Sequence, residues 1–175
     1  MYWFDSAYEA VSRFMDMGGN VLWLVAVVLF TMWMLIFERV WYFQFGWKKD
    51  VGTAIATWEG RSERNSWNAH QIRDKLISEA SQEINQYLPV IKTLVALCPL
   101  LGLLGTVTGM IEVFNVMAVT GGGDAKSMAG GVSRATIPTM AGMIAALSGV
   151  FANTYLTQTV KRESEFLKDN LTTDH

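Results

Sequence analysis

The chain has 175 residues, of which 51% are hydrophobic, 12% aromatic and only 17% charged. A soluble domain has about a quarter charged residues, so this chain is short of charge, and its apolar content excludes a disordered protein. The net charge of −2 argues against a nucleic-acid partner, and the single cysteine, Cys98, excludes a disulfide framework. The two histidines lie far from Cys98 and from each other, so we expect no metal and no other cofactor.

Residues 1–20 predict a short amphipathic helix. Three acidic residues and Arg13 stand here, whereas a cleaved signal peptide begins with a basic segment. The aromatic residues Tyr2, Trp3, Phe4 and Tyr8 suit the boundary between membrane and water. We therefore expect this helix to lie in the interface and the apolar segment after it to be retained.

Three long stretches of the chain carry no charge. They are Val21–Phe37 with 17 residues, Thr93–Ile111 with 19 and Ala135–Val160 with 26. A helix needs roughly 20 such residues to cross a hydrocarbon core of about 30 Å. Buried helices of a soluble bundle are the alternative, but the rest of the chain offers too little polar surface to cover three of them. The sequence predicts an all-α integral membrane protein with transmembrane helices over residues 21–43, 89–119 and 134–160, the second and third extended into the cytoplasm.

The distribution of lysine and arginine sets the orientation, because these residues are enriched in cytoplasmic loops. Eight lie between the first and second spans and three follow the third, whereas only Arg13 and Lys126 lie on the opposite side. The N-terminus is predicted to face outward, and residues 44–88 and 161–175 to face the cytoplasm.

The cytoplasmic stretch over residues 44–88 has a helical pattern. A short helix is expected to end near Gly60, and Asn65–Ser66 can cap a second one. The second is predicted to run without a break into span two, with Pro89 and Pro99 as positions for a kink. Span three likewise is expected to continue past Lys161 toward Leu171. Apolar residues recur along the second helix at steps of three and four: Ile72, Leu76, Ala80, Ile84, Tyr87, Leu88 and Ile91.

So short a helical region encloses no enzyme pocket. The sequence offers no pair of nucleophile and base and no phosphate loop, so we expect no enzymatic activity. The glycines at 121–123 and 130–131 predict a flexible outer hairpin over residues 120–133. A phosphate-binding turn is the alternative, but no Lys–Ser/Thr element follows these glycines in register.

Small residues recur on spans two and three at helical spacing. Such stripes let two helices approach closely inside a bilayer. We interpret five glycines as helix-packing positions: Gly102, Gly105, Gly109, Gly142 and Gly149.

Two charged residues lie near the outer ends of these spans. Glu112 and Arg134 each cost about 2.5–3.5 kcal/mol at the membrane centre and less near its edge. If Thr106 and Thr139 share one depth, a rise of about 1.5 Å per residue places Glu112 about 9 Å and Arg134 about 7.5 Å outward of them. We predict that the two charges pair near the outer mouth, within a subunit or between neighbours.

Two motifs resemble those of a known family. The segment Gly102-Leu-Leu-Gly-Thr-Val-Thr-Gly109, followed by Phe114, resembles the second-span motif of the ExbB/TolQ proton-channel family, to which the MotA stators are related. The segment Gly131-Val-Ser-Arg-Ala-Thr-Ile-Pro-Thr-Met-Ala-Gly142 resembles the third-span motif. The ExbB branch is the nearer one.

The resemblance implies a homopentamer in the bacterial inner membrane, with an outward, periplasmic N-terminus and a cytoplasmic C-terminus. Spans two and three would line a pore, with Thr106 and Thr139 at the family's pore-lining threonines. Single-span ExbD/TolR-type subunits would bring an aspartate into this pore. A TonB-type protein would then transmit the energy to outer-membrane uptake, for example of iron–siderophores.

Arg134 departs from the family pattern, because many members carry Glu at this position. A guanidinium does not deprotonate, so the role of a proton acceptor is not carried over. Neither span has an acid at mid-membrane, which fits a partner's aspartate. Two alternatives stay open: a TolQ-type subunit for envelope integrity and division, and a passive membrane scaffold assembled through its small residues.

Overall fold

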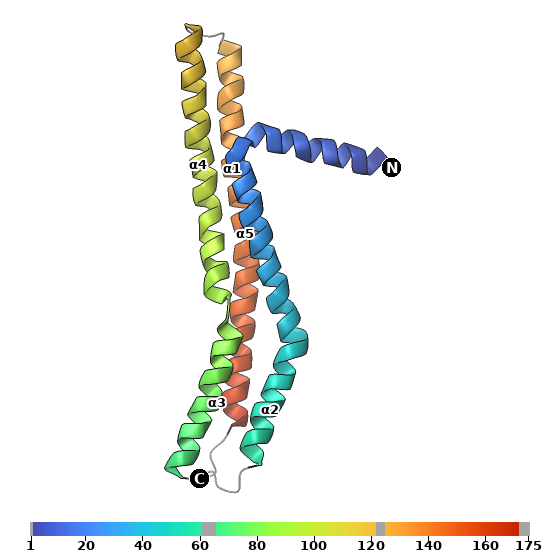
Figure 1. Cartoon of the computed structure of the whole chain (residues 1–175), viewed down its shortest axis with the longest axis vertical. Coiled ribbons are helices and arrows are strands. Elements are labelled where there is room, and N and C mark those ends of the chain that lie inside the picture. Colours follow the sequence, from blue (N-terminus) through green and yellow to red (C-terminus); the bar gives the residue numbers. More distant parts are fainter. Residues whose placement is uncertain (1, 61–65, 122–124, 172–175) are drawn as a thin grey trace. The chain divides into compact units, whose positions relative to one another are not determined.

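A computed structural model of the chain describes residues 2–60, 66–121 and 125–171. These residues form helices and no β-strand, which confirms the all-α prediction (Figure 1). In chain order the elements are α1 (Tyr2–Trp41), a five-residue π-helix η1 (Tyr42–Gly46), α2 (Trp47–Glu59), α3 (Trp67–Asn85), α4 (Leu88–Thr120) and α5 (Ala125–Asn170).

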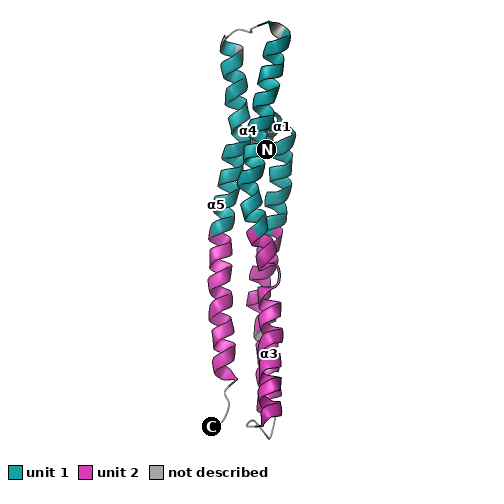
Figure 2. Cartoon of the chain, turned by 90° about the vertical axis from the view of Figure 1, so that its left-hand side faces the viewer, with its two compact units in different colours: residues 1–33, 93–150 teal, residues 34–92, 151–175 magenta. Residues whose placement is uncertain are grey.

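Three helical stretches are long and apolar enough to cross a bilayer, as predicted. They are Tyr8–Gly46, Trp67–Val119 and Met128–Asn170. The chain forms two compact units (Figure 2). Unit 1 comprises residues 1–33 and 93–150, and unit 2 comprises residues 34–92 and 151–175.

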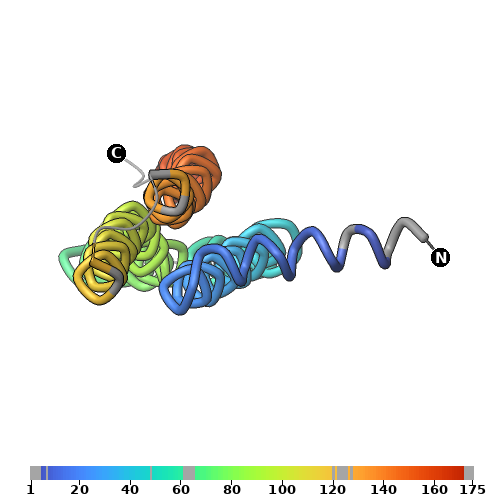
Figure 3. The backbone as a smooth tube through the Cα atoms, turned by 90° about the horizontal axis from the view of Figure 1, so that it is seen from above, coloured from blue at the N-terminus to red at the C-terminus, as the bar shows by residue number. Residues whose placement is uncertain are grey.

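Unit 1 combines the first part of α1 with most of α4 and the first half of α5. Gly19 breaks α1 with a φ of 63° and a ψ of −162°, a conformation that a residue with a Cβ rarely adopts. The segment before Gly19 therefore turns away from the segment after it (Figure 3). In one core cluster of this unit Val25, Cys98, Ala145 and Ala146 are buried, and Val28, Leu29 and Leu101 pack against them. Leu22 and Met32 of the same unit are also buried.

The turn between α4 and α5 is shorter than predicted. Helix α4 ends at Thr120, Gly121 takes a φ of 72°, and α5 begins at Ala125. The predicted loop over residues 120–133 is thus wrong for residues 125–133, which form the first turns of α5. The reason lies in the packing, because Gly131 faces Val113 across the two helices and is a contact residue instead of a flexible one. Residues 122–124 lie outside the described part of the chain.

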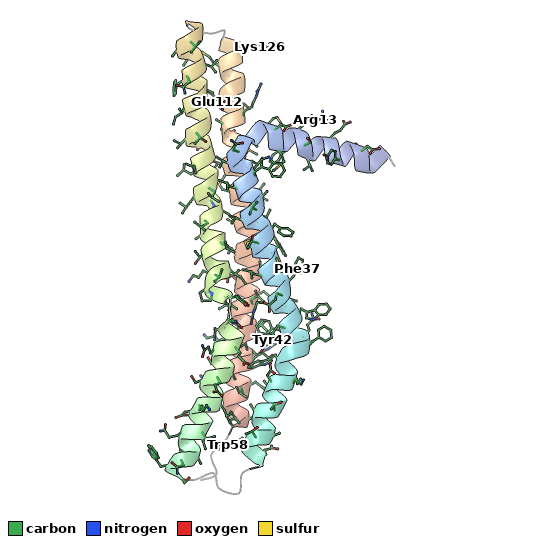
Figure 4. The ribbon with its side chains drawn as sticks, in the orientation of Figure 1. Arg13, Phe37, Tyr42, Trp58, Glu112 and Lys126 are labelled. Atoms are coloured by element: carbon green, nitrogen blue, oxygen red, sulfur yellow. The ribbon has the colours of Figure 1, made fainter. Side chains whose placement is uncertain are left out.

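Unit 2 packs α2, α3 and the end of α5 around large side chains. Trp58 of α2 is 1% exposed (Figure 4). The indole nitrogen of Trp47 donates a hydrogen bond to the Glu163 carboxylate at 3.0 Å. The core consists of Trp47, Val51, Trp58, Ala69, Ile84, Leu88, Val160, Leu167 and Leu171.

The helix ends in unit 2 follow local signals. Gly60 ends α2, and the Ser66 side chain accepts a hydrogen bond from the Ala69 amide at 3.3 Å, so both predictions are confirmed, while Asn65 lies outside the described residues. Helix α5 continues to Asn170, as predicted for the extension of span three. The Arg73 guanidinium donates to the Leu171 carbonyl and so covers an unpaired group at this end.

The helix predicted from residue 66 into span two is interrupted beside Pro89, one of the two positions predicted for a kink. Helix α3 ends at Asn85, Tyr87 has a φ of 64°, and α4 begins at Leu88. Pro89 supplies the physical reason. In a continuous helix its ring would meet the Asn85 carbonyl, whereas in the first turn of α4 its missing N–H costs nothing.

A buried arginine holds this break. Arg39, 2% exposed, donates from Nη1 to the Glu83 carbonyl at 3.0 Å and from Nη2 to the Gln86 side chain at 3.4 Å. Its guanidinium carbon lies 5.0 Å from the ring centre of Tyr42 and 4.8 Å from that of Tyr87. The arginine thus ties the end of α1 to the end of α3 and to the residues of the break, and we call this group the Arg39 clamp.

Replacing Arg39 with Met should lower the melting temperature of the detergent-purified chain, measured by circular dichroism. The substitution keeps the bulk of the side chain but removes the charged donor to the Glu83 carbonyl and the contacts with the Tyr42 and Tyr87 rings, at a cost of about 1–3 kcal/mol. Arg162→Met is the matched control, because that guanidinium is 76% exposed and its one ion pair within the described residues is with the adjacent Glu163. Its effect should stay within about 0.5 kcal/mol. Equal losses in both variants would contradict the clamp.

Candidate functional site

All the site residues predicted from the sequence lie in unit 1, on α4 and α5. The two helices run antiparallel here, and pairs of facing residues set their register. Cys98 faces Gly142, Gly102 faces Thr139, and Gly109 faces Ala135. The structure therefore brings the two sequence motifs together along one helix–helix contact.

The two helix backbones lie against each other around Gly102 and Gly142. A Cβ atom added to Gly142 would lie 2.5 Å from the carbonyl oxygen of Cys98, and one added to Gly102 would lie 2.9 Å from the Cα atom of Thr139. Both distances are too short for real atoms, so backbone packs directly on backbone. The Thr139 hydroxyl donates a hydrogen bond to the Gly102 carbonyl at 2.8 Å, which links α5 to α4 at this point.

The other three glycines of the predicted set also face close neighbours. An added Cβ would contact the Pro138 ring at Gly105, Ala135 at Gly109, and the side chains of Met32 and Val95 at Gly149. Sequence reasoning missed Gly131, where a Cβ would lie 2.6 Å from the Val113 side chain. The four-residue spacing between Gly131 and Ala135 was a signal that the stripe of small residues on α5 extends toward the turn between α4 and α5.

Each of the two threonines donates its hydroxyl proton to a backbone carbonyl group. Thr106 donates to the Leu103 carbonyl of its own helix at 2.7 Å, whereas Thr139 donates across to α4. Both residues are half-buried. A hydroxyl has one proton to donate and two lone pairs that accept. With the proton engaged, each oxygen is free to accept a hydrogen bond from a protonated carboxyl group.

The assumption of one depth for these threonines needs a correction. Gly102 is level with Thr139, and Thr106 lies four residues along α4. At about 1.5 Å per residue the offset is about 6 Å, or one helical turn. The two hydroxyl oxygens therefore lie about one helical turn apart along the helix pair and not at the same depth.

A cavity of about 880 Å³ opens beside this contact, between the bend of α1 and the parts of α4 and α5 that lead to their connecting turn. Five polar side chains line it: Asp16 and Asn20 from α1, Thr108 and Glu112 from α4, and Arg134 from α5 (Figure 4 labels Glu112). The rest of the lining is glycine, proline, alanine and apolar side chains. Sequence reasoning missed the contribution of Asp16 and Asn20, because only the fold of α1 at Gly19 brings that segment here.

Glu112 and Arg134 lie within the same turn of the helix pair. The contact of Gly109 with Ala135 lies on one side of them and that of Val113 with Gly131 on the other. Both side chains are exposed and line the same cavity. No ion pair joins them within the described part of this chain. Their pairing, within a subunit or between neighbours, stays a prediction.

Comparison with known proteins identifies the family. The model of the MotA/TolQ/ExbB proton channel family matches residues 49–169, which include α4 and nearly all of α5. The chain belongs to the MotA/TolQ/ExbB proton channel family. With its three membrane-length helices, it is a multi-pass membrane protein.

Two proteins from Synechocystis sp. with ExbB in their names are similar in sequence to this chain. The biopolymer transport protein named ExbB-like 1 is 49% identical over 61 residues, which are 33% of this chain and 24% of that protein. ExbB-like 3 is 32% identical over 82 residues, which are 43% of this chain and 39% of that protein. The chain thus spans less than half the length of these relatives. Among the described residues of this family member, no three His, Cys, Asp or Glu side chains lie together as metal ligands.

Adding one methyl group at Gly142 should destabilise the helix pair. Gly142→Ala forces the new Cβ against the Cys98 carbonyl, and overpacking of this kind costs about 1–3 kcal/mol. Gly130→Ala is the matched control on the same helix, because nothing lies within 4 Å of its added Cβ. It should stabilise α5 slightly, by up to about 1 kcal/mol. Melting temperatures in detergent compare the two, and equal shifts would contradict close backbone packing.

Exchanging the charges of Glu112 and Arg134 tests their pairing. Either single reversal, Glu112→Arg or Arg134→Glu, places like charges on one wall of the cavity and should lower the proton flux of the reconstituted complex. The double exchange should restore part of the flux, with a coupling energy of about 0.5–3 kcal/mol in a double-mutant cycle. Strictly additive effects would show that the two charges do not interact.

Proposed function

We propose that this chain is the channel subunit of an inner-membrane complex that couples the proton motive force to TonB-dependent outer-membrane uptake, for example of iron–siderophores. Membership of the proton-channel family supports the channel role, and the names of the two relatives refer to biopolymer transport. In this proposal the N-terminus is periplasmic, the C-terminus is cytoplasmic, and the chain has no enzymatic activity of its own.

The observation that carries the proposal is the polarity of spans two and three. Thr93–Ile111 and Ala135–Val160 contain no Asp, Glu, Lys or Arg, yet both carry hydroxyl groups along their length. A proton needs a titratable group to cross the apolar layer, so a partner must supply it. We assign this group to the aspartate of an ExbD/TolR-type single-span subunit, held near Thr106 and Thr139, whose oxygens are free to accept its proton in a hydrogen bond.

The surface of the helix pair supports assembly around such a partner. Large apolar side chains stay exposed along both helices in the single chain, so other subunits as well as lipid tails can cover them. We propose a homopentamer, with spans two and three facing a central pore that holds the partner helices. The membrane potential supplies about 2.3 kcal/mol for each proton per 100 mV, which a TonB-type protein then transmits. The exposed side chains are Leu100, Leu103, Leu104, Val107 and Ile111 on α4, and Met140, Met143, Ile144, Leu147 and Val150 on α5.

Removing the hydroxyl of either threonine should slow proton conduction without preventing assembly. Thr106→Val and Thr139→Val should each lower the flux into vesicles about tenfold, since a hydrogen bond to an ionisable group contributes about 1.5–3 kcal/mol. A pH-sensitive dye inside vesicles that contain this chain and an ExbD-type partner measures the flux. Thr139→Ser is the control, because it keeps both the hydroxyl and its bond to Gly102.

Assembly must be measured on the same samples, by the mass of the purified complex. Intact assembly with reduced flux in the valine variants and normal flux in Thr139→Ser is the expected result. Normal flux in both valine variants would instead favour a passive scaffold.

A further inference from the structure

Unit 2 contains a cavity that the proton path does not use. It has a volume of about 550 Å³ and lies between the first turn of α4 and the last part of α5 that is still free of charge. Leu88 and Pro89 form an apolar side of it, and Lys92, Asn153, Thr157 and Gln158 form a polar side.

The polar side has the chemistry of an anion site. Lys92 brings three N–H donors, and the amides of Asn153 and Gln158 bring two each. No carboxylate is among the described residues that line the cavity, and no ion pair of Lys92 is found in the described part of the chain. The first turn of α4 adds the positive end of the helix dipole.

The position of these residues along the chain places the cavity at the membrane boundary. Lys92 is the last charge before the uncharged stretch Thr93–Ile111, and Gln158 stands three residues before Lys161, the first charge after the third span. Both boundaries face the cytoplasm in the proposed orientation. The lipid headgroups of that leaflet include anionic ones, which attract basic side chains near the surface.

We propose that this cavity binds the phosphodiester headgroup of an anionic phospholipid of the cytoplasmic leaflet. Lys92 contacts the phosphate, the two amides donate to its remaining oxygens, and Leu88 and Pro89 lie against the upper acyl chains. The proposal rests on the proposed cytoplasmic orientation but not on proton conduction. A free phosphate shares the same headgroup chemistry and is separated from the lipid by experiment.

Native mass spectrometry of the full-length chain, purified in detergent, tests the site. The wild-type protein is titrated with phosphatidylglycerol, with phosphatidylcholine, and with phosphatidylglycerol in the presence of inorganic phosphate. Lys92→Gln should weaken phosphatidylglycerol binding about fivefold and leave phosphatidylcholine binding unchanged. Lys161→Gln is the matched control, because this lysine also lies at the boundary but outside the cavity, and it should bind as the wild type does.

Lys92→Arg separates loss of charge from loss of folding. It should retain phosphatidylglycerol binding within about twofold, and Lys92→Gln should keep the wild-type circular dichroism. Equal binding by Lys92→Gln and the wild type, or an equal loss in Lys161→Gln, would overturn the proposal. Displacement of the lipid by millimolar inorganic phosphate would identify a free phosphate as the ligand and overturn the lipid assignment. If the protein binds phosphatidylglycerol in this way but conducts no protons, the proposed function is contradicted and the lipid site is not.

Discussion

Direct packing of α4 backbone on α5 backbone is the constraint on which the candidate site depends. Inside a bilayer the hydrophobic effect does not hold two helices together, so dispersion contacts and hydrogen bonds must do so. Gly102 and Gly142 leave no side chain between the helices, and the Thr139 hydroxyl bonds to the Gly102 carbonyl at the same point. This crossing sets the register of the pair. The relative depth of the two threonines and the placement of Glu112 and Arg134 in one turn both follow from that register.

The same contact decides what the threonines offer to a partner. A free hydroxyl rotates and serves as donor or acceptor, whereas Thr106 and Thr139 each engage their proton with a backbone carbonyl. Their oxygens then act as acceptors in fixed positions about one helical turn apart. A helix pair of this kind neither stores nor releases a proton itself, since a hydroxyl does not ionise at ordinary pH. In the proposed complex, it provides a polar lining along which a partner's carboxyl group is stabilised while that group carries the proton.

The helices of the two units are held together by different kinds of contact. Unit 1 uses glycine, alanine and the hydrogen bond from Thr139 to Gly102, as expected where lipid surrounds the helices. Unit 2 buries tryptophans and leucines, caps its helices with Ser66 and Arg73, and places the Arg39 clamp at the break between α3 and α4. Water drives large apolar side chains together, so this second pattern is typical of helices that pack outside the hydrocarbon layer.

The sequence by itself determined the helical class, the three spans, and the ends of helices at Gly60 and Ser66, because hydropathy and capping act over a few residues. It also pointed to the glycines and threonines through their spacing and their motifs. Only the tertiary structure decided the helical start of residues 125–133, the contact of Gly131, and the cavity that joins Asp16 to Glu112 and Arg134. These features arise where segments far apart in the chain meet. A local pattern shows which residues can pack closely, but the register between two helices is fixed by the contacts of both.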